Sequence, residues 1–133
     1  MYLRNCRILK PSIVKKNLVI IPTYNERENI ESIIEAVLSQ PIEALHILII
    51  DDNSPDGTAS LVMKLQKSHE GRIHLIQRPG KLGLGTAYIT GFKWALEQQY
   101  DFIFEKPCLR SVNIIGTSMI LKPCFQVLNF ISI

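Results

Sequence analysis

Two short and almost wholly apolar runs constrain the fold of this chain most strongly. The first is Leu18–Ile21, which stops at Pro22, and the second is Ala44–Ile50, which stops at the polar stretch DDNSPDG. Short apolar, partly β-branched runs bounded by turn signals are typical of strands that are buried on both faces of a parallel sheet. We therefore predict two central strands at these positions.

Segments with helical periodicity separate these strands from two further ones. Asn25 followed by Glu28 fits an N-terminal cap, which predicts a helix over about 26–39. Asp56 or Thr58 can cap a second helix, and small and apolar residues predict a third over about 83–98, with further strands near 73–76 and 101–104. Four strands alternating with three helices predict an α/β fold with a doubly wound parallel sheet.

Length and charge define the expected domain organisation. The 133 residues allow one domain with a hydrophobic core. Residues 1–17 carry five basic and no acidic side chains, residues 106–133 carry three basic and no acidic ones, and residues 18–105 carry seven basic and 12 acidic ones. We expect a domain over 18–105 between a basic arm (1–17) and a tail (106–133) without an assignable element. The acidic centre argues against a nucleic-acid-binding protein.

The sequence carries few signals of compartment. The three cysteines include no C-x-x-C pair, so neither a disulfide framework nor a zinc site is indicated. No run approaches the roughly 18 consecutive apolar residues of a membrane span, and residues 1–17 lack the apolar region of a signal peptide. We expect a cytoplasmic protein without a transmembrane segment.

The most polar junctions follow the first two predicted strands, at Pro22–Glu26 and Asp51–Gly57. Parallel sheets bind ligands at the carboxyl ends of their strands, so both junctions are expected on one rim. A carboxylate there can accept a hydrogen bond from a nucleobase N–H or a ribose hydroxyl, and Tyr24 can stack on a base. The alternative is that Asp51 and Asp52 are a solvated pair that only stabilises a turn.

Three segments, in this order, carry a family resemblance. They are residues 19–30 (VIIPTYNERENI), 49–58 (IIDDNSPDGT) and 81–88 (KLGLGTAY). The combination closely resembles the dolichol-phosphate (polyprenol-phosphate) mannosyltransferases, which are inverting GT-A glycosyltransferases of family 2, and the resemblance covers about residues 18–105.

The resemblance implies a GT-A fold and transfer of mannose from GDP-mannose to a polyprenyl (dolichyl) phosphate. It also implies a peripheral position at the cytoplasmic face of a membrane. Lys81 lies in a loop that could approach the diphosphate of the donor. By position, the residues implied to contact GDP-mannose are Pro22, Tyr24, Glu26, Ile50 and Asp52.

The sequence departs from the family after the fourth predicted strand. Relatives place an Asp-x-Asp motif there for Mg²⁺ or Mn²⁺, whereas here Glu105 is followed by Lys106-Pro107-Cys108, so the expected metal ligands are missing. Only 28 residues follow Glu105 and none resembles the acceptor-binding half, so we expect an incomplete copy, truncated or frameshifted, whose catalytic residues are unknown.

Two alternatives to an active transferase stay open. One is a catalytically inactive remnant that still binds nucleotide. The other is a receiver-like signalling module, for which an acidic pair should follow the first strand. Pro22-Thr23 stands there instead, which argues against the receiver.

Overall fold

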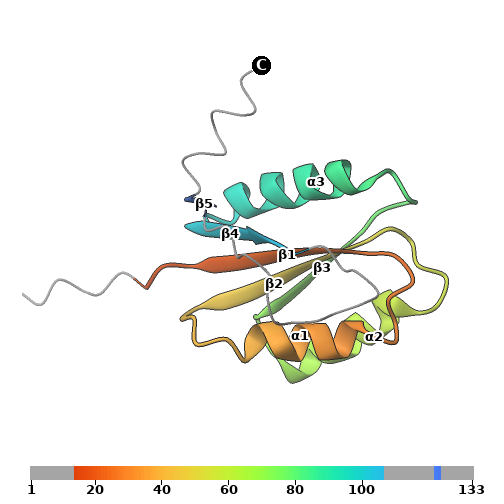
Figure 1. Cartoon of the computed structure of the whole chain (residues 1–133), viewed down its shortest axis with the longest axis horizontal. Coiled ribbons are helices and arrows are strands. Elements are labelled where there is room, and N and C mark those ends of the chain that lie inside the picture. The colour runs from red at the N-terminus through yellow and green to blue at the C-terminus, as the bar shows by residue number, and fades with distance from the viewer. Residues whose placement is uncertain (1–13, 107–121, 124–133) are drawn as a thin grey trace, which may run out of the picture.

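The computed structural model describes residues 14–106 and 122–123, which form a sheet with helices on both of its faces (Figure 1). The elements are β1 (Asn17–Thr23), α1 (Ile30–Leu38), β2 (Leu45–Asp51), α2 (Thr58–Ser68), β3 (Ile73–Gln77), α3 (Leu84–Glu97), β4 (Phe102–Glu105) and β5 (Lys122–Pro123). Each of the four strands and three helices predicted from the sequence is present, with boundaries shifted by a few residues.

The strands lie in the order β3-β2-β1-β4-β5. β1 pairs in parallel with β2 and β4, and β2 pairs in parallel with β3, whereas the two-residue β5 runs antiparallel to β4. Helices α1 and α2 cover one face of the sheet and α3 covers the other (Figure 1). The predicted doubly wound parallel sheet is therefore confirmed.

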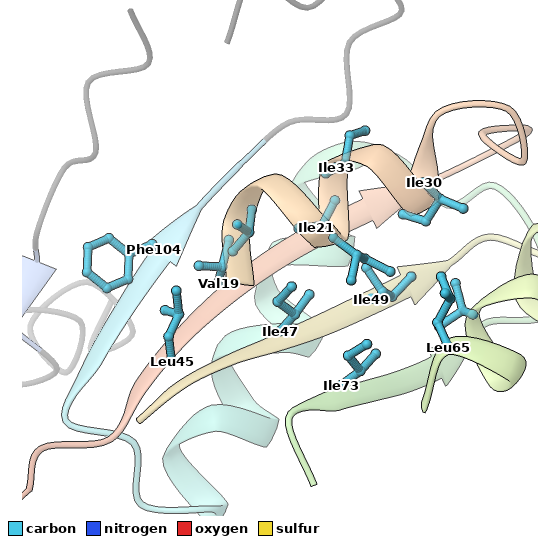
Figure 2. Close-up of a cluster of buried hydrophobic side chains, with 13 residues drawn as sticks. Val19, Ile21, Ile30, Ile33, Leu45, Ile47, Ile49, Leu65, Ile73 and Phe104 are labelled. Carbon is cyan, nitrogen blue, oxygen red and sulfur yellow. The ribbon is translucent and has the colours of Figure 1, made fainter. Parts of the chain in front are cut away.

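The central strands are buried on both faces, as their apolar runs predict. Val19 and Ile21 point into the cluster beneath α1 and α2, which Figure 2 shows, whereas Leu18 and Ile20 belong to the cluster beneath α3. All seven residues of β1 are buried. Alternation along a strand sends successive side chains to opposite faces, so a strand covered on both faces is apolar through its middle, and in β1 the polar Asn17 and Thr23 stand at the two ends.

The predicted start of α1 is wrong by about four residues. Asn25 has a φ of 56°, and its backbone N–H donates to the Ser54 hydroxyl at 3.0 Å instead of belonging to a helix cap. The carbonyl of Glu26 then accepts from the N–H groups of Asn29 and Ile30, which closes a turn before the helix begins. Asn25 therefore connects the loop after β1 to the loop after β2. The N-cap position of α1 is occupied by Asn29, which makes no side-chain cap hydrogen bond.

The flanks are only partly described. β1 begins at Asn17, one residue before the predicted strand at Leu18, and β4 ends at Glu105, one residue beyond the predicted strand end at 104. Within the tail, Lys122 and Pro123 form β5, although the sequence assigned no element there. The first 13 residues of the basic arm and the rest of the tail beyond Lys106 lie outside the described residues. No helix of the described part is long and apolar enough to cross a bilayer.

Close packing of α3 on the sheet requires a glycine at position 91. A Cβ added to Gly91 would lie 2.8 Å from Cγ2 of Ile20 and 3.0 Å from Cδ1 of Ile50.

We expect Gly91→Ala to lower the free energy of unfolding by about 1–3 kcal/mol through overpacking, measured by urea denaturation. Gly85→Ala, in the same helix with no neighbour within 4 Å, is the control and should stabilise by up to about 1 kcal/mol; equal effects would contradict the prediction.

Two histidines and a tyrosine form a half-buried cluster between the sheet and the C-terminal end of α3. The Tyr100 hydroxyl lies 2.7 Å from Nδ1 of His46 and 3.3 Å from Nε2 of His74, and Trp94 packs on His74 and Tyr100. Burial lowers the pKa of both histidines, and the positive charges of His74, Arg72 and Lys16 lower that of His46 further. Both imidazoles are therefore favoured in the neutral form.

The cluster makes the stability of the fold depend on pH. Because both histidine pKa values are lower in the folded state, the unfolded chain takes up more protons as the pH falls below about 6.5. We expect the urea midpoint to be highest above that pH and to fall between pH 7 and pH 5. The double variant His46→Gln/His74→Gln should reduce this dependence, whereas His69→Gln, outside the cluster, should retain it. An unchanged slope in the double variant would refute the assignment.

Candidate functional site

Three loops meet at the carboxyl ends of β1, β2 and β3. The backbone N–H of Asp52 donates to the carbonyl of Thr23 at 3.1 Å, and the N–H of Arg78 donates to the carbonyl of Asp51 at 2.8 Å. These bonds continue the sheet by one step beyond the strands and hold the starts of loops 24–29, 52–57 and 78–83 together. The expectation that the first two junctions share one rim is confirmed, and the structure adds the third.

Asp51 and Asp52 have different surroundings although they are adjacent. Asp51 is fully buried, and its carboxylate accepts from the Thr23 hydroxyl at 3.1 Å and from the backbone N–H of Ser54 at 2.9 Å. The Ser54 hydroxyl also donates to it. Asp51 therefore stabilises the loop after β2, but the alternative of a solvated aspartate pair is wrong, because both Asp51 and Asp52 are buried.

Asp52 forms a buried ion pair with Arg78. Nε of Arg78 lies 2.6 Å from Oδ1 of Asp52, and Nη2 lies 2.7 Å from Oδ2, so the contact is bidentate. The side chains are 5% and 9% exposed for Arg78 and Asp52. Such planar two-bond pairing fixes the orientation of both groups.

Arg78 is held from its other side by the start of α3. Its Nη1 donates to the Thr86 hydroxyl at 2.7 Å, and its Nη2 also approaches the carbonyl of Gly83 at 3.3 Å. No role was assigned to Arg78 from the sequence, so this residue was missed. Its position directly after β3, at the same edge as Asp52, was the available signal.

Tyr24 and Lys81 form the exposed part of the rim. Tyr24 is 40% exposed, and Nζ of Lys81 lies 4.8 Å from the centre of its ring. A cation over an aromatic face is attracted by the ring quadrupole, and this contact places a positive charge beside an accessible ring. The structure thus brings together two residues that the resemblance implied for different parts of the donor.

The other residues implied by the resemblance lie deeper. Pro22 and Ile50 are buried and face each other in the β1–β2 register. Glu26 is 7% exposed, its carboxylate accepts from the side-chain amide of Asn29 at 3.0 Å, and its backbone N–H donates to the Thr58 hydroxyl at 3.1 Å. In this structure Glu26 therefore joins the N-cap residue of α1 to the first residue of α2.

Asp56 joins the loops after β1 and β2. Burial acts to raise the pKa of Asp56, but hydrogen bonds from the Thr58 hydroxyl and from the backbone N–H groups of Arg27 and Thr58 outweigh it and lower that pKa. Its Oδ1 accepts the N–H of Thr58 at 2.9 Å, but Gly57 is the N-cap residue of α2 and that cap has no side-chain hydrogen bond, so the predicted capping by Asp56 or Thr58 is wrong. The ionised carboxylate thereby keeps these two loops in register.

The described residues do not fit the divalent metal that the resemblance implies. Among residues 14–106 and 122–123, no group of three or more His, Cys, Asp or Glu side chains is placed to hold a metal ion. Asp51 is engaged by Thr23 and Ser54, and Asp52 is engaged by Arg78. No metal ligands are therefore assigned within this part of the chain.

Comparison with known proteins gives the family. The model of "Glycosyl transferase family 2" matches residues 18–104. The chain belongs to this family. Among curated relatives, the polyprenol monophosphomannose synthase of Mycolicibacterium smegmatis is 45% identical over 91 residues, covering 68% of this chain and 34% of the relative. The undecaprenyl-phosphate mannosyltransferase of Micrococcus luteus is 40% identical over 88 residues, covering 66% and 35%.

A solved structure supports the same assignment. Mannosyltransferase PcManGT from Pyrobaculum calidifontis, in complex with GDP-Man and Mn²⁺, superposes with a TM-score of 0.64 at 25% identity, covering 73% of this chain and 28% of that one. The described sheet and helices thus match the GT-A fold that the family resemblance implied. The chain spans about a third of the length of the curated relatives it matches.

The buried ion pair should contribute to stability only as a pair. We expect Asp52→Ala and Arg78→Ala each to lower the free energy of unfolding by about 3–5 kcal/mol, because each leaves an uncompensated buried charge. The double variant should lose less than the sum of the single losses. Urea denaturation at neutral pH measures all three, with Lys93→Ala, an exposed cation on α3, as control. Additive single losses would contradict the pairing.

Proposed function

We propose that this chain is the donor-binding part of a polyprenyl-phosphate mannosyltransferase and that its ligand is GDP-mannose. The observation that carries the proposal is the Asp52 carboxylate, which Arg78 fixes at the carboxyl ends of the strands. The names of the two curated relatives support mannose transfer to a polyprenyl phosphate. PcManGT, solved with GDP-Man, supports the choice of donor.

The pairing of Asp52 leaves capacity for a nucleobase. An ionised carboxylate offers about four lone-pair positions, and the bidentate contact with Arg78 uses two of them. The Watson–Crick edge of guanine presents two adjacent N–H donors, which match two carboxylate oxygens. Uracil presents one N–H between two carbonyl acceptors, which a carboxylate would repel. We therefore propose that Asp52 favours guanine over uracil.

Each of the remaining rim residues is proposed to contact a different part of the donor. The exposed Tyr24 ring can stack on the base, and the Lys81 ammonium beside it can offset charge on the diphosphate. Pro22 and Ile50 would form the apolar floor below the nucleoside, because they are paired neighbours at the ends of β1 and β2. Glu26 would contribute a carboxylate from the turn before α1.

The proposed reaction makes modest demands on acid–base chemistry. A phosphate oxygen of the lipid acceptor attacks the anomeric carbon of mannose, the bond from that carbon to the diphosphate breaks, and GDP leaves with the electron pair. The lipid phosphate is anionic near neutral pH, so it needs no strong general base. The donor-binding residues act by orienting the sugar nucleotide and by compensating charge on the departing diphosphate. An acceptor of this kind would place the protein at a membrane surface.

Calorimetric titration of the purified chain tests the proposal. We expect GDP and GDP-mannose to bind more tightly than UDP, and Tyr24→Ala to weaken GDP binding about tenfold through lost stacking. Met63→Ala, an exposed substitution on α2, is the control. Added Mn²⁺ should change the affinity little, since the described residues hold no metal cluster. Absence of GDP binding by the folded chain would refute the proposal.

A transfer assay separates the active enzyme from the nucleotide-binding remnant. The nucleotide-binding remnant is favoured because both aspartates of the rim, Asp51 and Asp52, are already bound to protein groups. Labelled GDP-mannose is incubated with the chain and vesicles that contain polyprenyl phosphate, with and without Mn²⁺. Labelled lipid product would establish transfer, whereas GDP binding without product would establish the remnant.

A further inference from the structure

The Thr86 hydroxyl lies behind the Asp52–Arg78 ion pair, at the first turn of α3. We propose that Thr86 is a positioning residue, which orients Arg78 and, through it, the carboxylate that receives the nucleobase. The inference rests on the proposed function, because it concerns the same site. Thr86 lies within the segment 81–88 that carries the family resemblance, but neither the resemblance nor the comparisons assign it a role.

The hydrogen bonds around Thr86 show that its hydroxyl acts as an acceptor toward Arg78. Its Oγ1 lies 2.8 Å from the carbonyl of Leu82 and 2.7 Å from the carbonyl of Gly83. A hydroxyl has a single proton, and both carbonyls can only accept, so that proton is directed to the backbone. The lone pairs of Oγ1 are then available to Arg78, whose Nη1 donates at 2.7 Å.

This contact fixes the guanidinium plane at a second edge. Nε and Nη2 are bound to Asp52, and Nη1 is bound to Thr86. Because the guanidinium is planar and rigid, partners at both edges allow it one orientation. The bidentate contact aligns Arg78 and Asp52 with each other, and the bonds from Arg78 to Thr86 at 2.7 Å and to the Gly83 carbonyl at 3.3 Å align the pair with the start of α3. Without the Thr86 acceptor only the longer Gly83 contact remains, so the pair, and with it the carboxylate, is less firmly oriented.

The same contact closes the loop that carries Lys81. Arg78 and Thr86 are eight positions apart, and their side-chain hydrogen bond joins the end of β3 to the start of α3. Lys81 lies between them and reaches over the Tyr24 ring. The Thr86 hydroxyl thus helps to position both the Asp52 carboxylate, which is proposed to bind the base, and Lys81, which is proposed to contact the diphosphate.

Thr90 provides a matched comparison within the same helix. Its hydroxyl donates to the carbonyl of Thr86 at 2.9 Å, which is the usual backbone contact of a threonine in a helix. The described contacts of Thr90 include no arginine. A purely helical role would therefore make Thr86 and Thr90 equivalent, whereas the proposed role makes Thr86 distinct.

Three variants, Thr86→Val, Thr86→Ser and Thr90→Val, test the inference by calorimetric titration with GDP after urea denaturation has shown that each is folded. We expect Thr86→Val to weaken binding about tenfold, since it removes one hydrogen bond to a charged group. Thr86→Ser should restore the affinity and Thr90→Val should leave it unchanged. In an Asp52→Asn background, Thr86→Val should have little further effect. Equal losses in the two valine variants, or no rescue by serine, would overturn the inference.

A second measurement does not depend on nucleotide. In an NMR spectrum of the free protein, the Nε–H of Arg78 should exchange slowly with solvent in the wild type and in Thr86→Ser, and rapidly in Thr86→Val. Failure of the wild type to bind GDP would refute the proposed function, while this exchange rate would still decide whether Thr86 orients Arg78. Equal exchange rates in all three proteins would refute the positioning role.

Discussion

Burial of β1 and β2 on both faces is the constraint on which the described structure depends. Two parallel neighbours in full register bring Pro22 opposite Ile50 and Thr23 opposite Asp51, so the loops that follow must leave the sheet side by side. The helices have to cover both faces of the sheet, because the side chains on both faces of these strands are apolar. The rim is therefore a consequence of how the core is built.

A buried charge pair is the unusual feature of that rim. Taking Asp52 and Arg78 out of water is unfavourable, and the bidentate geometry together with the further bonds of Arg78 offsets this only while every partner stays in place. Such a pair contributes little net stability compared with an apolar core, but it defines the direction of one carboxylate. A fixed acceptor of this kind suits the recognition of a nucleobase edge, which is a directional task.

The sequence predicted some parts of the site and missed others. The strand ends and the shared rim followed from hydrophobic runs that stop at polar residues, and Tyr24 and Asp52 were singled out by the family motif. The partner of Asp52 was not predicted, because Arg78 lies 26 positions away and joins Asp52 only when β3 pairs with β2. The cap at Asn25 was misjudged because its spacing to Glu28 is local, whereas its actual partner, Ser54, belongs to the next loop.

The sequence alone determined the order of elements, the two-sided burial of the central strands and the membership of a glycosyltransferase family, since each depends on residue types at short spacings. Tertiary structure decided how the two adjacent aspartates differ. Asp51 meets Thr23 and Ser54, while Asp52 meets Arg78, and successive side chains of an extended chain point in opposite directions toward different neighbours. Ser54 is a local partner, but Thr23 and Arg78 meet these aspartates only through strand pairing, a long-range property that no local spacing encodes.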